Sequence, residues 1–217
     1  MTISRFLQGP DIMEMIMTIP MHRIPGTSAR TVWLTFDDGP HPEYTDKILD
    51  VLKEYGISAT FFVVGANVGP MGKAILKRVG NEGHSIGNHA YSHQDLTMLT
   101  ENEIRDEIMR TDAIIAELRN AEKVFRPPYG TSSLTIDRIA RELGYRKVLW
   151  NVDTRDWDPA YQPDRWVERA VSLVGQRKRS VVIAHDIHKS TADHIATMID
   201  QIGNVTFARC TGARCTR

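Results

Sequence analysis

The sequence predicts an α/β fold built from parallel strands that alternate with helices. Its 217 residues, 41% of them hydrophobic and 25% charged, are sufficient for one domain with a full-sized core. Seven short apolar or β-branched runs are separated by segments with the spacing of amphipathic helices. Such units form either a barrel or a doubly wound sheet, and in both the carboxyl ends of the strands collect ligands.

The regular pattern occupies residues 31–207. Before it, residues 1–30 contain Met, Pro and Gly without a sustained period, and we expect them to form an arm laid over the domain. After it, residues 208–217 are a tail rich in Thr, Gly and Arg. The sequence contains no internal repeat and no low-complexity segment, so one folded domain is expected.

Each predicted strand is a short run of apolar or β-branched residues. The runs are residues 31–36, 59–64, 84–88, 124–126, 147–152, 180–185 and 205–207. Several of them lead directly into polar residues. Those polar residues are therefore the candidates for a functional site at the strand ends.

Amphipathic helices are predicted between these runs. The residues expected to begin a helix are Thr45, Thr100 and either Ser190 or Thr191, and the glycines expected to end one are Gly56 and Gly203. Thr100 is followed three positions later by Glu103, which is the spacing of a capping box.

Charge and hydropathy exclude several classes of partner. The 27 Lys and Arg residues balance 27 Asp and Glu residues, so there is no basic field for nucleic acid and no polybasic run for an anionic membrane. The longest apolar stretches fall short of the about 18 residues that a membrane helix needs. Asp11 and Glu14 interrupt the apolar region that a signal peptide requires, so we expect a cytoplasmic location.

The two cysteines, Cys210 and Cys215, both lie in the tail. They can form a small terminal disulfide loop. Without a histidine nearby they make a poor metal site. We therefore expect them to be non-catalytic.

Two adjacent aspartates, Asp37 and Asp38, follow the first strand and precede Gly39-Pro40. Neighbouring residues on a strand face opposite ways, so a turn at Gly39 can bring both carboxylates to the strand end in different positions. One can then bind a metal while the other accepts a proton. The alternative is that an Asp before Gly-Pro only caps a turn.

His89 and His93 follow the third strand at a spacing of i, i+4. On one helical turn both imidazoles would share a face and could hold one divalent ion, although such pairs also decorate surfaces. Ala90 excludes the H-E-x-x-H pattern of metalloproteases. Three ligands, Asp38, His89 and His93, would leave a position open for water, as in catalytic metal sites, and Asp37 is available as a base.

The run at 124–126 leads into the turn Arg-Pro-Pro-Tyr-Gly at residues 126–130. Its two prolines fix the backbone and leave the N–H of Tyr129 to point into a cleft. Arg126 either belongs to that cleft or is a surface cation.

Two further strand ends place titratable groups beside apolar ones. Residues 153–157, Asp-Thr-Arg-Asp-Trp, put carboxylates next to an aromatic side chain, and the alternative is a core Trp with solvated charges. Residues 181–183 lead to His185, which is alternatively a hydrogen-bonded core histidine. Five strands that each end in polar residues are more than packing of the core alone would require. The histidines without comparable context, expected to be bystanders, are His41, His84, His188 and His194.

Taken in order, five motifs resemble those of the polysaccharide deacetylases, the NodB-homology domain of carbohydrate esterase family 4. They are TFDDGP at 35–40, H-x-x-x-H at 89–93, RPPYG at 126–130, DTRDW at 153–157 and IAHD at 183–186. The resemblance covers roughly residues 31–207 and departs mildly at Ile183, where the family commonly has Leu. It implies a distorted (β/α) barrel of about seven parallel strands, with residues 31–207 as the catalytic domain.

The resemblance implies a metal site formed by Asp38, His89 and His93. The ion would be one divalent metal, most often Zn²⁺, with Co²⁺ or Ni²⁺ as alternatives. Asp37 would be the general base, and Arg126 would hold it ionised and oriented because a nearby cation lowers the pKa of a carboxyl group.

The resemblance also implies roles for the other motifs. The backbone N–H of Tyr129 would stabilise the oxyanion of the tetrahedral intermediate. His185, kept protonated by Asp156, would protonate the departing nitrogen. Trp157 and Ile183 would line a pocket for the acetyl methyl group.

These roles imply hydrolytic N-deacetylation of N-acetylglucosamine units in a chitin-like oligosaccharide or a peptidoglycan-type glycan. The size and layout resemble the chitooligosaccharide deacetylase type. The alternatives are an acetylxylan O-deacetylase of the same family and a non-catalytic glycan-binding protein. The H-x-x-x-H pair argues against the metal-poor relatives that hydrolyse cyclic amides. The expected partner is thus an N-acetylated glycan, and the sequence leaves the oligomeric state open.

Overall fold

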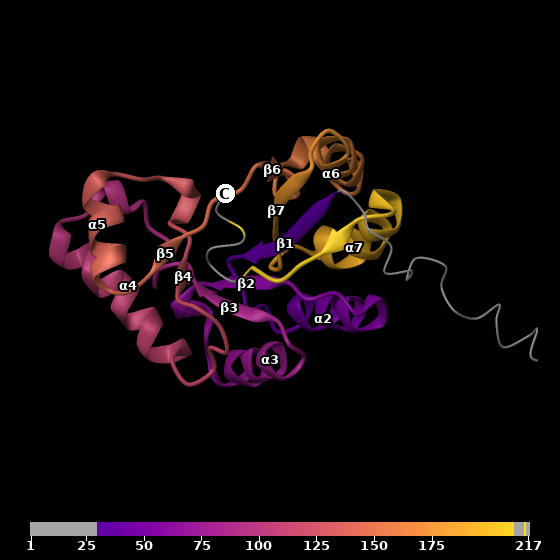
Figure 1. Ribbon diagram of the computed structural model, residues 1–217. Coiled ribbons are helices and arrows are strands. Elements are labelled where there is room, and N and C mark those ends of the chain that lie inside the picture. The colour runs from indigo at the N-terminus through magenta and orange to yellow at the C-terminus, as the bar shows by residue number, and fades with distance from the viewer. Residues whose placement is uncertain (1–29, 211–214, 216–217) are drawn as a thin grey trace, which may run out of the picture.

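The computed structural model describes residues 30–210 and 215. Within these residues, eight parallel strands form one curled sheet of order β5-β4-β3-β2-β1-β7-β6, with β8 paired to β1. Helices surround this sheet (Figure 1). The fold is the distorted (β/α) barrel that the sequence predicts. The expected N-terminal arm lies outside the described residues, apart from Arg30.

The strands are β1 (Thr31–Asp37), β2 (Thr60–Val63), β3 (Ser85–Asn88), β4 (Val124–Phe125), β5 (Arg146–Lys147), β6 (Val152–Asp153), β7 (Arg179–His185) and β8 (Thr206–Phe207). The helices are α2 (Tyr44–Tyr55), α3 (Pro70–Asn81), α4 (Glu101–Ile115), α5 (Leu134–Glu142), α6 (Arg165–Gly175) and α7 (Lys189–Ile202). Their α-helical length and buried apolar faces agree with the amphipathic spacing in the sequence.

Alternate residues of β1 face opposite sides of the sheet. Those in the main core, which also contains side chains of the outer helices, are Val32, Leu34 and Phe36. Trp33 belongs instead to a separate cluster inside the barrel. The same alternation turns Thr35 and Asp37 inward, so β1 delivers the Asp37 carboxylate to the carboxyl end of the barrel interior.

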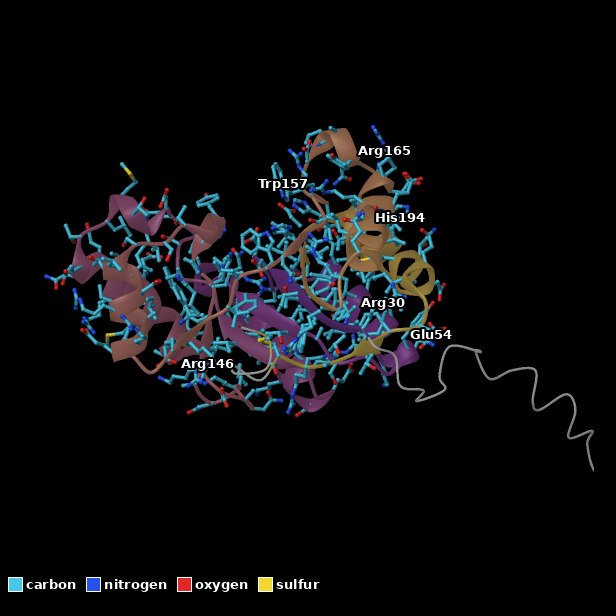
Figure 2. All side chains as sticks on the ribbon, turned by 45° about the horizontal axis from the view of Figure 1, so that its top comes forward. Arg30, Glu54, Arg146, Trp157, Arg165 and His194 are labelled. Atoms are coloured by element: carbon cyan, nitrogen blue, oxygen red, sulfur yellow. A yellow bond between two sulfur atoms is a disulfide. The ribbon has the colours of Figure 1, made fainter. Side chains whose placement is uncertain are left out.

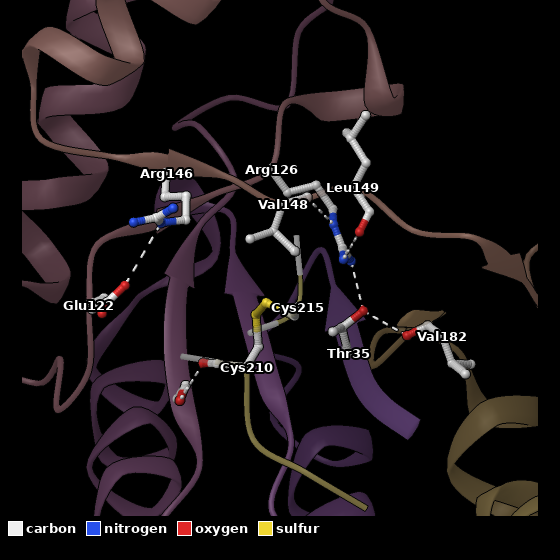
Figure 3. Close-up of a disulfide and its surroundings, with 10 residues drawn as sticks. Thr35, Glu122, Arg126, Arg146, Val148, Leu149, Val182, Cys210 and Cys215 are labelled. Atoms are coloured by element: carbon white, nitrogen blue, oxygen red, sulfur yellow. Dashed lines mark hydrogen bonds and ion pairs between the residues drawn. A yellow bond between two sulfur atoms is a disulfide. The ribbon is translucent and has the colours of Figure 1, made fainter. Parts of the chain in front are cut away.

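The Cys210–Cys215 disulfide forms, with 5.4 Å between the Cα atoms. Both cysteines are buried in the inner cluster with Trp33, Phe62, Val124, Val148 and Val181. Figure 3 shows the disulfide among the strands, below Arg126 and to the left of Thr35 in that view. Cys210 and Cys215 therefore contribute apolar surface to the end of the barrel opposite Asp37.

The predicted strand at 147–152 is wrong as a single element. Its ends belong to β5 and β6, which lie at opposite edges of the sheet. Between them, the Val148 N–H donates to Phe125 O at 2.9 Å and the Asn151 N–H donates to Val181 O at 3.1 Å. The apolar run thus bridges the two edges and closes the barrel, which is why its composition is that of a strand.

Two predicted helix starts are also wrong, whereas the capping box is confirmed at Thr100 and Glu103. Helix α2 begins at Tyr44. Its first N–H groups are capped by His41 Nδ1, which accepts hydrogen bonds from Glu43 and Tyr44 at 3.2 Å.

The predicted starting residues lie inside their helices because their hydroxyl groups have tertiary partners. Thr45 donates to Asp186 Oδ2 at 2.6 Å. Thr191, two residues into α7, donates to Asp156 Oδ2 at 2.5 Å. Both helices end at the predicted glycines, Gly56 and Gly203.

Among the described helices, none combines the length and the apolar character that crossing a bilayer demands.

Candidate active site

A cavity of about 370 Å³ opens where β1, β3 and β7 end. Its lining residues are Asp37, Asp38, His89, His93, Tyr129, Trp150, Asp153, Trp157, Ile183 and His185. Eight of the ten predicted site residues are among them. The other two, Arg126 and Asp156, are fully buried and contact cavity residues. The structure therefore brings all the predicted site residues together.

Asp37 forms a buried ion pair with Arg126. Arg126 Nη1 donates to Asp37 Oδ1 at 2.7 Å and to Thr35 Oγ1 at 2.8 Å. Burial lowers the pKa of the guanidinium group, and the charge of Asp37 opposes that shift. Arg126 is 0% exposed, so it is not the surface cation that the sequence left as an alternative.

Arg126 is held rigidly by the closing segment of the barrel. Its Nε donates to Val148 O at 3.0 Å and its Nη2 donates to Leu149 O at 3.4 Å (Figure 3). The guanidinium carbon lies 4.1 Å from the centre of the Phe62 ring. These contacts fix the cation, and through it the orientation of the Asp37 carboxylate.

Asp38 leaves the strand in a left-handed conformation, with φ of 77°. This turn sends its side chain toward the two histidines. Asp38 Oδ1 lies 3.3 Å from His89 Nε2 and 3.1 Å from His93 Nε2. Burial raises the pKa of Asp38, but hydrogen bonds with the two histidines outweigh it and hold the pKa well below its ordinary value.

The tautomer of His89 follows from its other ring nitrogen. His89 Nδ1 lies 2.6 Å from the carbonyl oxygen of Arg126, which can only accept, so Nδ1 carries the proton in the neutral ring. The lone pair of Nε2 then points at Asp38. This carbonyl–histidine pairing is the usual second contact of a metal-binding imidazole.

The donor set fits a divalent cation. Three ligand atoms, one from each of Asp38, His89 and His93, lie within 4.8 Å of one another. Asp38 Oδ1 is buried, and among the described residues the two imidazole nitrogens are the polar atoms that it faces. A carboxylate oxygen that faces two imidazole nitrogens is stabilised by protons on those nitrogens or by a cation between them, and carboxylate and imidazole are ordinary zinc ligands.

His89 and His93 do not share a helical turn, so that expectation is wrong. Residues 89–93 form an irregular loop after β3, in which Ala90 has φ of 62° and His93 has φ of 58°. The two left-handed residues fold the loop back on itself. The ring centres of the histidines are consequently 5.0 Å apart.

His185, at the end of β7, pairs with Asp156. Its Nδ1 lies 2.8 Å from Asp156 Oδ1, and its backbone N–H donates to Asp156 Oδ2 at 2.7 Å. Burial lowers the pKa of His185, but the hydrogen bond and charge of Asp156 outweigh it and raise the pKa to about 9. The ring thus carries a proton at neutral pH and faces the cavity.

Asp156 is positioned by two hydroxyl groups. Thr154 Oγ1 donates to its Oδ1 at 3.0 Å and Thr191 Oγ1 donates to its Oδ2. Burial raises the pKa of Asp156, yet the contacts with His185 and Thr191 lower it further than burial raises it, so the carboxylate stays ionised.

Apolar side chains surround the polar groups. Trp157, which follows β6 and is labelled in Figure 2, is 49% exposed, so it is not a core Trp. Tyr129 is 64% exposed, has φ of 59°, and lies edge-on to the His93 ring at 4.6 Å between centres. Ile183 is buried on β7. Trp150 also lines the cavity, although it belongs to none of the five sequence motifs.

Sequence reasoning missed Asp186. Its buried carboxylate accepts hydrogen bonds from the Gly39 N–H at 3.0 Å and from Thr45 Oγ1. Burial raises its pKa to about 7. A Cβ atom at Gly39 would lie 2.1 Å from this carboxylate, so only glycine fits there. The indication in the sequence was its position directly after His185.

Among the four histidines expected to be bystanders, His188 has its ring centre 5.8 Å from that of His185. Burial lowers its pKa. His84 lies elsewhere and accepts the N–H of Ala59. His194 contacts Ser190 O within its own helix.

Comparison with known proteins identifies relatives. A family model described as polysaccharide deacetylase matches residues 25–148. A peptidoglycan-N-acetylglucosamine deacetylase of Bacillus cereus is 47% identical over 127 residues, which are 58% of this chain and 46% of that protein. The peptidoglycan-N-acetylmuramic acid deacetylase PdaA of Bacillus subtilis is 35% identical over 196 residues, covering 89% of this chain and 74% of that protein.

A solved structure of a deacetylase is also similar to this chain. It is described as T48 deacetylase with substrate, and it matches with a TM-score of 0.73 and 36% identity over 83% of this chain and 90% of that chain. The chain spans less than half the length of the Bacillus cereus protein.

Proposed function

The chain belongs to the polysaccharide deacetylase family, carbohydrate esterase family 4, and we propose that it hydrolyses the N-acetyl group of N-acetylglucosamine units with the help of one divalent metal ion. The observation that carries this proposal is one cavity in which an Asp paired with Arg126, a three-residue ligand set and a protonated His face each other. Binding alone would not need a base and an acid on either side of a metal site.

Asp38, His89 and His93 would hold the ion. Zn²⁺ suits one carboxylate and two imidazoles best, and Co²⁺ or Ni²⁺ are alternatives. When bound, a divalent ion supplies Lewis-acid polarisation of the acetamide carbonyl and lowers the pKa of a water molecule.

Asp37 would act as the general base. Its Oδ2 faces the ligand set, 3.7 Å from His89 Nε2, while its Oδ1 is engaged by Arg126. The fixed cation keeps the carboxylate oriented, so that Oδ2 accepts a proton as water attacks the acetamide carbon. The backbone N–H of Tyr129 would then stabilise the oxyanion.

His185 would act as the general acid. An amine anion is a very poor leaving group, so the nitrogen must gain a proton as the C–N bond breaks. Asp156 binds Nδ1 and leaves Nε2 to donate that proton. The products are acetate and the free amine, which balances the addition of one water.

The apolar side of the cavity fits the acetyl methyl group. Ile183 and Trp157 form it, on the side of β6 and β7. We propose an N-acetylated chitin-like oligosaccharide or peptidoglycan-type glycan as the substrate. The two relatives named above are deacetylases of N-acetylglucosamine and of N-acetylmuramic acid in peptidoglycan, and both of these sugars carry the N-acetyl group.

The test is acetate release and product mass spectrometry with chitin oligomers, peptidoglycan fragments and acetylxylan side by side. Each reaction is run with added Zn²⁺, with chelator, and with metal restored after chelation. We expect metal-dependent loss of acetyl groups from one or both N-acetylated glycans. Preference for acetylxylan would support the O-deacetylase alternative, and glycan binding without acetate release would support a non-catalytic protein.

A further inference from the structure

The loop that carries both histidines has a conformation that needs external support. Ala90 and His93 both have positive φ values, of 62° and 58°. Side chains with a Cβ atom rarely adopt this region, and such residues persist only where the surroundings hold them. The ligand geometry depends on these two residues, since they turn the His89 and His93 rings toward Asp38.

Helix α4 supplies a buried carboxylate to this loop. Glu107 Oε2 accepts the backbone N–H groups of Tyr91 at 2.9 Å and Ser92 at 2.8 Å. Glu107 Oε1 accepts the hydroxyl of Ser92 at 2.8 Å. Glu107 is only 6% exposed, and no ion pair joins it to a Lys or Arg of residues 30–210. Three donors from the loop therefore occupy both of its carboxyl oxygens.

One helical turn later, Thr111 fixes the start of the same loop. Its Oγ1 donates to Ala90 O at 2.7 Å, and the Gly65 N–H donates to the same oxygen at 3.0 Å. On the other side of the residue, the Ala90 N–H donates to Asn88 Oδ1 at 2.9 Å. Both backbone polar groups of the left-handed Ala90 are thus engaged.

The hydrogen bonds from Glu107 and Thr111 are made to residues between the two histidines. They therefore do not occupy either imidazole ring, and both rings can act as ligands. Glu107 holds the middle of the loop and Thr111 holds the residue after His89. Without them the loop could relax to ordinary negative φ values, and the two Nε2 atoms would separate.

We infer that Glu107 and Thr111 are positioning residues of the metal site, which hold the His89–His93 loop in its ligating conformation. This inference rests on the proposed function, because it assumes that Asp38, His89 and His93 bind a divalent ion. It predicts that α4 determines metal affinity without contacting the metal.

The test is calorimetric titration of metal-free protein with Zn²⁺. We expect Glu107→Ala to weaken binding by about 10- to 100-fold, the usual effect of losing a group that orients a ligand. Glu107→Gln should retain affinity within a few-fold, because one amide oxygen can still accept both backbone N–H groups. Asp106→Asn is the matched control, since it removes a carboxylate from the same helical turn at an exposed position.

Hydrogen–deuterium exchange of the metal-free proteins gives a second readout. Backbone amides of residues 90–93 should exchange faster in Glu107→Ala than in the wild type or in Asp106→Asn. If Glu107→Ala does not fold, Thr111→Val, which removes only a hydroxyl bond to the loop, decides by the same two measurements with a smaller expected loss of affinity.

Wild-type affinity for Zn²⁺ in the folded Glu107→Ala and Thr111→Val proteins would overturn the inference, even if loop exchange increased. A loss as large in Glu107→Gln as in Glu107→Ala would mean that charge and not loop geometry matters, and would also overturn it. Failure of the wild type itself to bind Zn²⁺, Co²⁺ or Ni²⁺ would instead refute the metal site of the proposed function.

Discussion

Asp37 and Asp38 are adjacent in the chain but have different partners. Asp37 faces inward on β1 and pairs with Arg126, whereas the left-handed turn at Asp38 directs its carboxylate to the histidines. The sequence predicted two separate tasks for the pair, with a turn cap as the alternative. The sequence alone could not distinguish these two alternatives, because Arg126, the cation that pairs with Asp37, lies 89 residues away in the chain.

The different partners predict different losses. Asp37→Asn should keep metal bound but lose turnover by roughly 10²- to 10⁴-fold, as expected for removal of a general base. Asp38→Ala should lose metal affinity as well. Metal content per folded chain, measured after dialysis, distinguishes them. If Asp37→Asn emptied the site while Asp38→Ala did not, the two roles would be reversed.

The pair of His185 and Asp156 predicts a pH dependence. His185 must be protonated to act as an acid, and its pKa is raised to about 9, so kcat/KM should fall as the pH rises through that value. Asp156→Asn removes the carboxylate that raises this pKa, and the alkaline limb should then move to lower pH. The pH profile of kcat/KM for both proteins is the measurement.

Two features sharpen this test. Burial lowers the pKa of His188, so the titration of that neighbouring ring falls on the acid side of the profile. His185→Ala should cost far more on an amide than on an activated acetate ester, whose leaving group needs little protonation. Equal losses on both substrates would mean that His185 shapes the pocket and does not transfer the proton.

At the scale of elements, helix α4 shows what periodicity can and cannot predict. Its capping box and its buried positions Ile104 and Ile108 were readable from spacing. Glu107 and Thr111 lie on the same buried face, so their burial was also implicit in the helical period. Their function could not be predicted, because it depends on hydrogen bonds to a loop. No local sequence pattern indicates the left-handed conformation of that loop.

The turn from β1 to α2 gives a prediction that depends on packing. A Cβ atom at Gly39 would lie 2.1 Å from Asp186 Oδ2, whereas a Cβ atom at Gly69 would meet nothing within 4 Å. Gly39→Ala should therefore displace Asp186, reduce activity and destabilise the fold by about 1–3 kcal/mol. Gly69→Ala is the matched control.

Chemical denaturation and acetate release measure both effects. A Gly39→Ala protein as stable and active as Gly69→Ala would show that the Asp186 carboxylate moves aside freely. Asp186 would then have no part in holding the turn that carries Asp38.

At the scale of the whole molecule, closing the barrel and building the site use the same residues. The segment between β5 and β6 bonds to both edges of the sheet, and its carbonyl groups at Val148 and Leu149 accept from Arg126. The cation that pairs with Asp37 therefore also holds the closing segment. The sequence predicted one strand there. A run of apolar residues has the same composition whether it pairs with one neighbouring strand or bridges two edges of a sheet.

The disulfide lies at the end of the barrel opposite the candidate active site. Because the two are separated, we expect loss of the disulfide to affect stability but not activity. Cys210 and Cys215 are buried against the inner apolar cluster, and the Ala208 N–H donates to Val32 O at 2.9 Å near the start of β1. Replacing both cysteines by Ala should cost about 2 kcal/mol, the chain-entropy value for so short a loop, and lower Tm by several degrees. Activity at 25 °C should stay unchanged, because no cysteine lines the cavity of residues 30–210 that contains Asp37.

Calorimetric unfolding with and without reductant measures the change in stability, and acetate release measures the activity. A loss of activity without a fall in Tm would mean that the tail acts on the site and not on the stability of the barrel.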